Sequence, residues 1–244
     1  MLPIFKINFK EINIFSKKPN LRLNFTKLPA LKTDTVELSS DNFPQKKALK
    51  ALGKFHFFAE IRKNTFEISD IKPIKISQKL QNKQELPIEA FIATVKRTAK
   101  ISNSETKNKT GLFVFSKNGT ILGNIETLDT KEWEKEPLVI GKYLRLHYLN
   151  ASYFDNYKGI GSALIQEATQ KSKEYGLQGQ LHVVAHNYAD KTRGNPLPFY
   201  VKTGFIDIEN PQLSKEELIN KYKHASRYAG THLYLLNDEN KAKL

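Results

Sequence analysis

The run Asn156–Ala163, with the sequence NYKGIGSA, holds the residue types that most clearly suggest chemistry. Glycine lets a backbone approach a ligand closely. The first N–H groups of a helix lack intrahelical partners and lie at the positive end of its dipole, so phosphates bind there. With Gly159 and Gly161 just before a helical pattern, the run predicts a phosphate-binding loop made of Asn156, Tyr157, Lys158, Gly159, Ile160, Gly161 and Ser162. A tight turn would explain the same pair of glycines.

Patterns on both sides of this loop supply the elements that must position it. Leu144, Leu146 and Tyr148 alternate with other residues, which predicts a strand whose buried face carries these three side chains. An amphipathic helix follows from Ser162 and ends at Gly176, because apolar residues recur at helical spacing at Ala163, Leu164, Ala168 and Tyr175. The loop lacks the Gly-Lys-Ser/Thr of a P-loop and the third glycine of a dinucleotide fingerprint.

A second motif, Phe-Tyr-x-x-x-Gly-Phe, runs from Phe199 to Phe205 after an expected strand at Leu181–Ala185. Together the two motifs resemble the GNAT family of acyl-CoA-dependent N-acyltransferases, whose pyrophosphate loop reads Gln/Arg-x-x-Gly-x-Gly/Ala. Asn156 stands where that family has Gln or Arg, which weakens one side-chain contact to phosphate. The resemblance covers about residues 110–237. It implies an α/β fold with a GNAT-like mixed, largely antiparallel central sheet flanked by helices, preceded by an N-terminal extension.

The resemblance also implies roles for single residues. Tyr200 matches the family tyrosine that faces the CoA sulfur as a general acid, and a phenol pKa of about 10 suits donation to a departing thiolate. Exposed backbone near Leu149 would pair with the pantetheine arm as an added strand would. Asn195 opens the second motif and is expected to contact the cofactor. The alternative is that Phe199 and Tyr200 form a core aromatic pair.

The general base has two candidates, Glu126 near the end of an expected hairpin and His147 on the next strand. His147 has the more suitable ordinary pKa, and alternation places it on the face opposite Leu146. Proton transfer through solvent, with no dedicated base, is the third possibility. His182 and His186 are expected on the surface of the sheet, and four residues along a strand separate them by about 13 Å, too far to share a metal ion. No metal is expected.

Composition indicates the class of protein and its compartment. The chain has 244 residues and no cysteine, so a disulfide framework and an acyl-thioester enzyme intermediate are both excluded. No apolar run reaches the roughly 18–20 residues that span a bilayer, and the N-terminus makes a poor signal peptide. These features favour a cytoplasmic protein without a membrane partner. The formal net charge of +14 resides mostly in residues 1–110, which hold 22 Lys and Arg against 10 Asp and Glu. This predicts either a solvated lysine-rich surface or attraction to an anionic partner.

Element by element, the sequence predicts a basic N-terminal extension over residues 1–54, a GNAT-like domain over 55–237 and a frayed tail over 238–244. Helices are expected at Gln45–Gly53, Ile76–Glu85, Asn195–Thr203 and Ser214–Lys223. Asn118-Gly119 between apolar runs predicts a hairpin. Strands are expected at Phe55–Ile61 and Thr65–Ile71 (joined by a turn at 62–64), Leu112–Phe115, Ile121–Leu128, Val139–Leu149, Phe205–Ile208 and Thr231–Leu236, whereas Ile88–Ile101 fits a strand or a helix.

These patterns lead to one main functional expectation and one alternative. The main one is an N-acetyltransferase in which a primary amine, on a small molecule or a protein, attacks acetyl-CoA directly. The alternative is an acyl-CoA-binding or scaffolding module with little turnover. Nucleic-acid binding is not expected, because no zinc-finger, RNP or helix-turn-helix pattern is present. No pattern of the sequence indicates the acceptor amine or an oligomeric state.

Overall fold

A computed structural model describes residues 39–57, 63–81, 83–100, 106–133, 141–151, 156–186, 196–222 and 230–244. All of them belong to one compact unit, Leu38–Leu244. Helix α1 therefore belongs to the same unit as the sheet, although the sequence assigned it to the extension.

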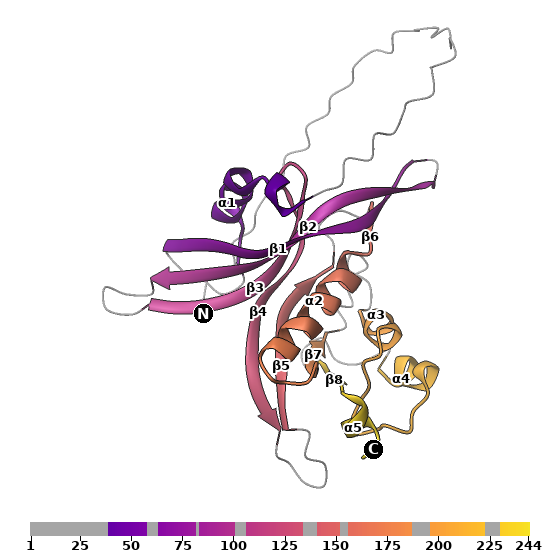
Figure 1. Cartoon of the computed structure of the whole chain (residues 1–244). Helices are drawn as coiled ribbons and strands as arrows, with labels where there is room; N and C mark the ends of the chain where they lie inside the picture. Colours follow the sequence, from indigo (N-terminus) through magenta and orange to yellow (C-terminus); the bar gives the residue numbers. More distant parts are fainter. Residues whose placement is uncertain are drawn as a thin grey trace, which may run out of the picture. The chain divides into compact units, whose positions relative to one another are not determined.

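The described part of the chain forms one eight-stranded sheet in the order β6-β1-β2-β3-β4-β5-β7-β8 (Figure 1). Every neighbouring pair is antiparallel except β5 and β7, which are parallel. The expectation of a mixed, largely antiparallel sheet flanked by helices is thus confirmed. The strands are β1 Lys63–Lys79, β2 Glu85–Lys100, β3 Thr106–Ser116, β4 Ile121–Trp133, β5 Gly141–Asn150, β6 Tyr157–Lys158, β7 Leu181–Ala185 and β8 Thr231–Leu235.

Helices cover both faces of the sheet. On one side, here called the α2 face, apolar residues of α2 (Ile160–Glu174) and α3 (Leu197–Lys202) pack on strand residues such as Leu112, Leu144 and Leu181. On the opposite face, α1 (Gln45–Lys54) packs on Phe91, Phe113 and Phe115. Figure 1 shows α2 lying across the middle strands, with α4 (Lys215–Lys221) beside α3 and α5 (Asp238–Lys241) near the C-terminus.

Local signals in the sequence found several elements correctly. Gly119 has φ +82° in the turn after Asn118, and its N–H donates to Ser116 O at 2.9 Å, so the expected hairpin between β3 and β4 is confirmed. Ser214 and Glu217 form the reciprocal capping box that begins α4. The predicted bounds of β7 are confirmed at both ends.

The N-terminal third differs from the expectation. Residues 55–57 are not strand, residues 58–62 lie outside the described part, and β1 begins at Lys63, within the expected turn, and continues into the expected helix at Ile76–Glu85. Alternation explains this, since Ile74 and Ile76 both pack on the main core and pair with Ala90 and Ile88 of β2. Pairing along a long neighbouring strand outweighs weak helix propensity. The ambiguous stretch Ile88–Ile101 is mostly strand β2.

Three further expectations at loops and ends were wrong. The strands expected at Leu112–Phe115 and Ile121–Leu128 are longer than predicted, because β3 begins at Thr106 and β4 continues to Trp133. The expected strand Phe205–Ile208 is a single bridge between Ile206 and Tyr234.

The expected frayed tail contains helix α5 instead. Asn237 caps α5, because its side chain accepts from Asn240 N. The side chain of Asn240 is buried and donates to Gln180 Oε1 at 2.7 Å. A satisfied buried amide of this kind anchors the end of the chain.

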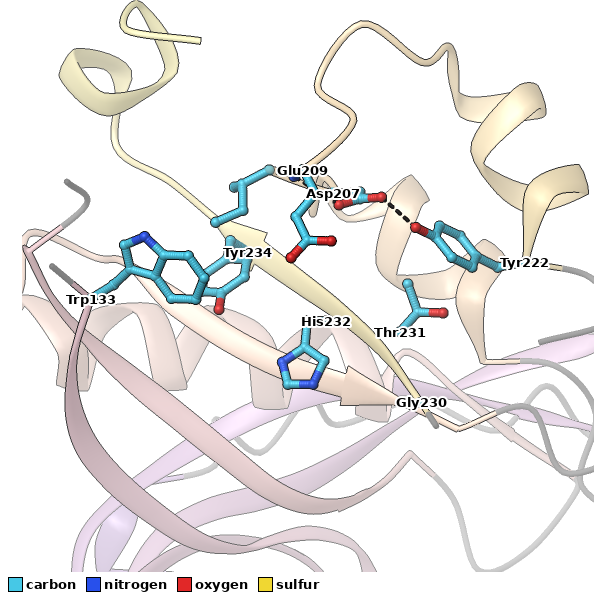
Figure 2. A pocket seen from close by; sticks show the side chains of 9 residues that line it. Trp133, Asp207, Glu209, Tyr222, Gly230, Thr231, His232 and Tyr234 are labelled. Atoms are coloured by element: carbon cyan, nitrogen blue, oxygen red, sulfur yellow. Dashed lines mark hydrogen bonds between the residues drawn. The ribbon is translucent and has the colours of Figure 1, made fainter. Parts of the chain in front are cut away.

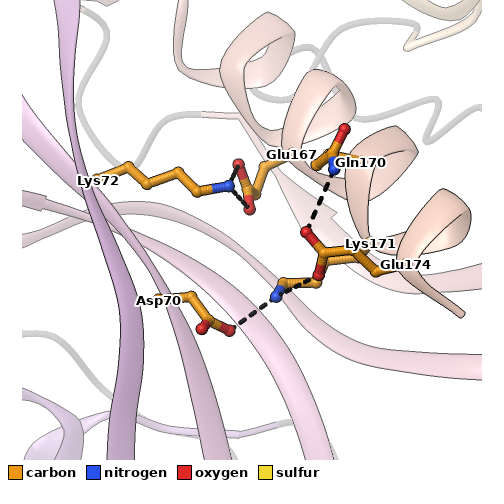
Figure 3. Close-up of polar contacts among 6 residues, drawn as sticks. All are labelled: Asp70, Lys72, Glu167, Gln170, Lys171 and Glu174. Carbon is orange, nitrogen blue, oxygen red and sulfur yellow. Dashed lines mark hydrogen bonds and ion pairs between the residues drawn. The ribbon is translucent and has the colours of Figure 1, made fainter.

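Charged side chains fasten β1 to α2 (Figure 3). Lys171 of α2, whose side chain is 8% exposed, donates to Asp70 at 2.7 Å and to Glu174 at 2.8 Å. Burial works against the charge of Lys171, but these hydrogen bonds outweigh it and raise its pKa to about 12. A second link joins Lys72 to both carboxylate oxygens of Glu167. Together they fix α2, and hence the loop that precedes it, on the sheet.

Candidate functional site

Strands β5 and β7 are paired over only a short stretch and then separate. Their parallel pairing comprises Leu144 with Leu181 and Arg145 with His182, and it stops there. Beyond that point β7 pairs only with β8, and β5 pairs only with β4, within the part of the chain that the structure describes. The edge of β5 from Leu146 to Asn150 is thus left without a strand neighbour on the β7 side.

The ladder between β4 and β5 is interrupted opposite this gap. Register pairs run up to Thr127–His147 and resume at Ile125–Leu149, with Glu126 and Tyr148 omitted. Tyr148 has φ +57°, is 52% exposed and does not lie on the buried face, so that expectation was wrong. The strand phase shifts there, because Leu146 and Leu149, three residues apart, both pack on the main core. A left-handed backbone at a non-glycine residue costs of order 1–3 kcal/mol and is enriched at functional sites.

The two candidate bases lie beside this interruption. His147 Nε2 is 2.9 Å from Asp129 Oδ2, and the ring is on the face opposite Leu146, as expected. Burial lowers the pKa of His147, against the opposing effect of Asp129, so the ring is neutral at pH 7. When Nε2–H points to Asp129, Nδ1 carries the lone pair that a base needs. Glu126 is only 3% exposed and interacts electrostatically with buried Arg97.

The first half of the loop expected to bind phosphate is part of the sheet. Tyr157 and Lys158 form β6 against Gln78 and Ser77 of β1. Asn156 O accepts a hydrogen bond from Lys79 N at 2.6 Å, and Lys158 forms an ion pair with Glu85 at the sheet edge.

The second half forms the first turn of α2. Gly159 is the N-cap residue with φ +90°, which strongly favours glycine, and no side chain caps the helix. Gly161 is buried, and a Cβ there would lie 2.8 Å from a ring carbon of Phe199. Both glycines therefore have structural roles. Ile160 points into the core, whereas Ser162 is exposed beside the uncapped N–H groups.

Tyr200 is positioned by α3. Pro196 caps that helix, and Pro198 falls in its first turn, where a missing N–H is harmless. The Tyr200 ring is 6% exposed and makes edge-to-face contacts with Phe199 and Phe205 at 5.3 and 5.4 Å. Burial raises its pKa, so the phenol keeps its proton. Asn195 lies outside the described residues.

The structure therefore brings the two motifs together but divides the expected chemistry between two faces. Gly161 contacts Phe199, so the loop and α3 are neighbours. Tyr200 belongs to the core of the α2 face, and His147 lies on the opposite face. Among the described residues, no group of three or more His, Asp or Glu side chains is arranged to hold a metal ion.

Sequence reasoning missed a pair of histidines on the opposite face. His182 of β7 is 2% exposed, and its Nε2 lies 3.1 Å from Nδ1 of His232 on β8. The expectation of a surface residue was wrong for His182, because β8 and the rings of Tyr143 and Tyr234 cover it. Burial, together with His232, lowers the pKa of His182 to about 3. The usable signal was the alternation in Thr231–Leu235, which puts His232 and Tyr234 on one face.

Comparisons of the chain with protein-family models, with curated proteins and with solved structures found no match. None of the helices among the described residues combines the length and the apolar character needed to cross a bilayer.

Proposed function

We propose that this protein is an acyl-CoA-dependent N-acyltransferase that transfers an acetyl group from acetyl-CoA to an amine. The observation that carries the proposal is the β5–α2–β7 unit, whose parallel strands part after two residue pairs and whose helix begins with Gly159 and Gly161. In sheets with parallel strands, ligands bind outside the carboxyl ends of the strands, where neighbouring strands separate.

Each part of the cofactor has a matching feature in this unit. The uncapped N–H groups of Ile160, Gly161 and Ser162 suit the pyrophosphate, since they add hydrogen-bond donors to a positive helix dipole. Among the described residues no strand pairs with β5 on the β7 side beyond Arg145, and the β5 backbone near Leu149 suits the pantetheine arm, whose amides would pair with it as a strand does. The acyl group would then lie between β5 and β7, near Tyr148.

The chemistry is direct attack of the amine nitrogen on the thioester carbonyl carbon. A C–N bond forms, the C–S bond breaks, the amine loses a proton and the CoA thiolate leaves. His147 is the stronger candidate base, because its lowered pKa leaves it neutral and its Nε2 lies 2.9 Å from Asp129 Oδ2. Tyr200 is the candidate acid. Its raised pKa keeps the phenol protonated, so the hydroxyl has a hydrogen to donate to the sulfur as negative charge develops there.

A CoA-binding module with little turnover is the second candidate, and two observations favour it. Tyr200 is packed between Phe199 and Phe205, as a core aromatic would be. The backbone of Asn156, which stands at the family's Gln/Arg position, is engaged with Lys79 of β1. Release of free thiol from acetyl-CoA with a panel of amines separates the candidates, because both bind CoA but only the enzyme turns it over.

The cofactor site is best tested with Ser162→Glu. This exposed position at the first turn of α2 tolerates a carboxylate, which stabilises a helix N-terminus. The same charge repels pyrophosphate, so CoA affinity should fall at least about tenfold, or about 1.4 kcal/mol, with no loss of thermal stability. A substitution at Gly161 would be ambiguous, because any side chain meets Phe199.

Gln166→Glu is the matched control, since it places the same charge on the exposed surface of α2 further along the helix. Calorimetry should show CoA affinity close to wild type for this variant. Equal CoA affinity in wild type, Ser162→Glu and Gln166→Glu would refute the site at the N-terminus of α2.

A further inference from the structure

A cavity of about 320 Å³ lies beside β8, away from the first turn of α2 (Figure 2). It is enclosed by the end of β4, the segment before α4, the end of α4 and β8. Its lining residues are Trp133, Asp207, Ile208, Glu209, Tyr222, Gly230, Thr231, His232 and Tyr234. Its size falls within the range of small-molecule sites.

The lining carries negative charge without a compensating cation. Asp207 and Glu209 are its acidic members, and no Lys or Arg is among the described residues that line the cavity. Asp207 is 4% exposed, and the donors to its carboxylate are Glu209 N, Asn210 Nδ2 and Tyr222 Oη. All three donors are uncharged. Figure 2 shows the Glu209 carboxylate directed into the space between Tyr234 and His232.

Aromatic rings form the other walls. Trp133 and Tyr234 meet edge to face with centroids 5.8 Å apart, and Tyr222 stands across the cavity, held by its hydrogen bond to Asp207 at 2.6 Å. Burial and then Asp207 raise the pKa of Tyr222, so its ring remains a neutral phenol. Aromatic faces attract cations electrostatically, most strongly where water is excluded.

The neighbouring cations and histidines do not change the charge of the cavity lining. Burial lowers the pKa of His232, so its ring adds no positive charge at pH 7. Lys221 lies over the Tyr222 ring, 5.2 Å from its centroid, and Arg145 acts on His232 and Tyr234 from β5. Neither side chain belongs to the cavity lining.

We propose that this cavity binds an organic cation with an alkylammonium or quaternary ammonium head, held between Glu209 and the rings of Trp133, Tyr222 and Tyr234. Two carboxylates and three aromatic rings around a cavity of this size suit a charge that is spread over methyl or methylene groups. The inference goes beyond acyl transfer, since binding needs neither CoA nor turnover. The cavity lies on the face of the sheet that carries His182 and His232, opposite α2.

Calorimetry on the full chain without CoA tests the proposal, with choline as the probe. Its neutral isostere 3,3-dimethylbutan-1-ol has the same shape without the charge. Choline should bind at least about tenfold more tightly than the isostere, the difference expected of a desolvated cation among aromatic rings. Equal affinity for the two compounds would overturn the proposal and indicate an apolar cavity, as would the absence of choline binding up to about 10 mM.

Variants locate the binding. Glu209→Gln removes an exposed charge and leaves the hydrogen bonds of Asp207 intact, so the fold should survive while choline affinity falls about fivefold or more. Glu216→Gln, on the exposed first turn of α4, is the matched control and should bind choline like wild type. Equal loss in both variants would show a long-range charge effect and refute this cavity as the site. Because CoA is titrated separately, either proposal can fail while the other stands.

Discussion

The two faces of the sheet differ in whether their buried cations have hydrogen-bond partners. On the α2 face, Lys171 is almost fully buried and donates hydrogen bonds to Asp70 and Glu174. On the opposite face, Arg97 is 2% exposed with its Cζ 4.0 Å from the centre of the Phe57 ring. Within the described residues, none of its guanidinium nitrogen atoms has a hydrogen-bond partner. Burial lowers the pKa of Arg97, and Glu126 opposes that effect.

This difference separates stabilising groups from candidate functional ones. A buried charge or polar atom without a hydrogen bond costs free energy. Lys171 on the α2 face avoids that cost, whereas the opposite face carries Arg97 and also His182 Nδ1, which has no partner among the described residues. The candidate base His147 and the cation cavity lie on this same face. We infer that the buried cation of the α2 face is paired for stability, whereas the buried cation of the opposite face lies without hydrogen bonds on the side of the sheet that carries His147 and the cavity.

The largest expected effect concerns Tyr200, the one candidate catalytic group on the α2 face. Tyr200→Phe keeps the ring contacts with Phe199 and Phe205, so the fold and CoA affinity should survive. Turnover should fall about 10²-fold, the lower end of what a positioned acid supplies, with little change in KM for acetyl-CoA. Thiol release measures it, with Tyr157→Phe on β6 as the control. Small and equal effects in both variants would indicate that Tyr200 is only a core aromatic residue. Proton transfer would then occur through solvent.

The comparison of buried cations is tested directly by unfolding in urea. Lys171→Ala removes two hydrogen bonds to carboxylates and should cost about 2 kcal/mol of unfolding free energy. Lys171→Met keeps the packing of the aliphatic stem, so its comparison with Lys171→Ala separates the contribution of the charge from that of the stem. Arg97→Met alone would leave the buried Glu126 without its opposing charge, so the double variant Arg97→Met/Glu126→Gln is the matched test and should be neutral or stabilising. If this double variant costs as much as Lys171→Ala, the two faces do not differ in the way inferred.

His182 predicts how acid acts on the opposite face. Its folded-state pKa is about 3, below the value of about 6.5 for an unfolded histidine. As pH falls below the unfolded value, the unfolded chain takes up a proton that the folded chain refuses, so stability falls by about 1.4 kcal/mol per pH unit until the folded pKa is reached. Urea unfolding near pH 7 and near pH 5 should show a smaller loss for His182→Phe than for wild type. Identical losses in the two proteins would argue against a neutral buried His182.

The smallest effect is expected at the N-terminus. The compact unit begins at Leu38, so deletion of residues 1–37 should change the unfolding free energy by less than about 0.5 kcal/mol. Deletion through residue 54 also removes Phe43 and Leu52 from the α1 core and should cost several kcal/mol, as large core truncations do. Thermal unfolding of both truncations against the full chain measures this. A destabilised shorter truncation would place residues 1–37 within the folded core.

The elements that the sequence predicted well depend on signals that span only a few residues. Asn118-Gly119 defines a turn, and Ser214 with Glu217 defines a helix start, because each acts on its own backbone. The helix after Gly161 was also found, since its spacing is local.

The failures involve partners that are far apart in the chain. From the helix alone Lys171 would be taken as exposed, but Asp70 of a distant strand pairs with it. His182 was expected on the surface of the sheet, but β8 covers it. The left-handed Tyr148 depends on the disturbed ladder with β4, which alternation within one strand does not reveal. The candidate site could be predicted as two motifs, but its division between two faces could not.

The order of strands has a consequence for how the chain acquires its structure. From β1 to β5 each strand pairs with its neighbour in sequence, whereas β5 reaches β7 only across α2. Contacts that are near in sequence close small loops and form quickly. We therefore expect the meander to form early, during synthesis, and the pairs of β5 with β7, β7 with β8 and β6 with β1 to close later. Weakening the β5–β7 pair should hasten unfolding more than it slows refolding, so the region that we assign to the ligand also affects the lifetime of the native state.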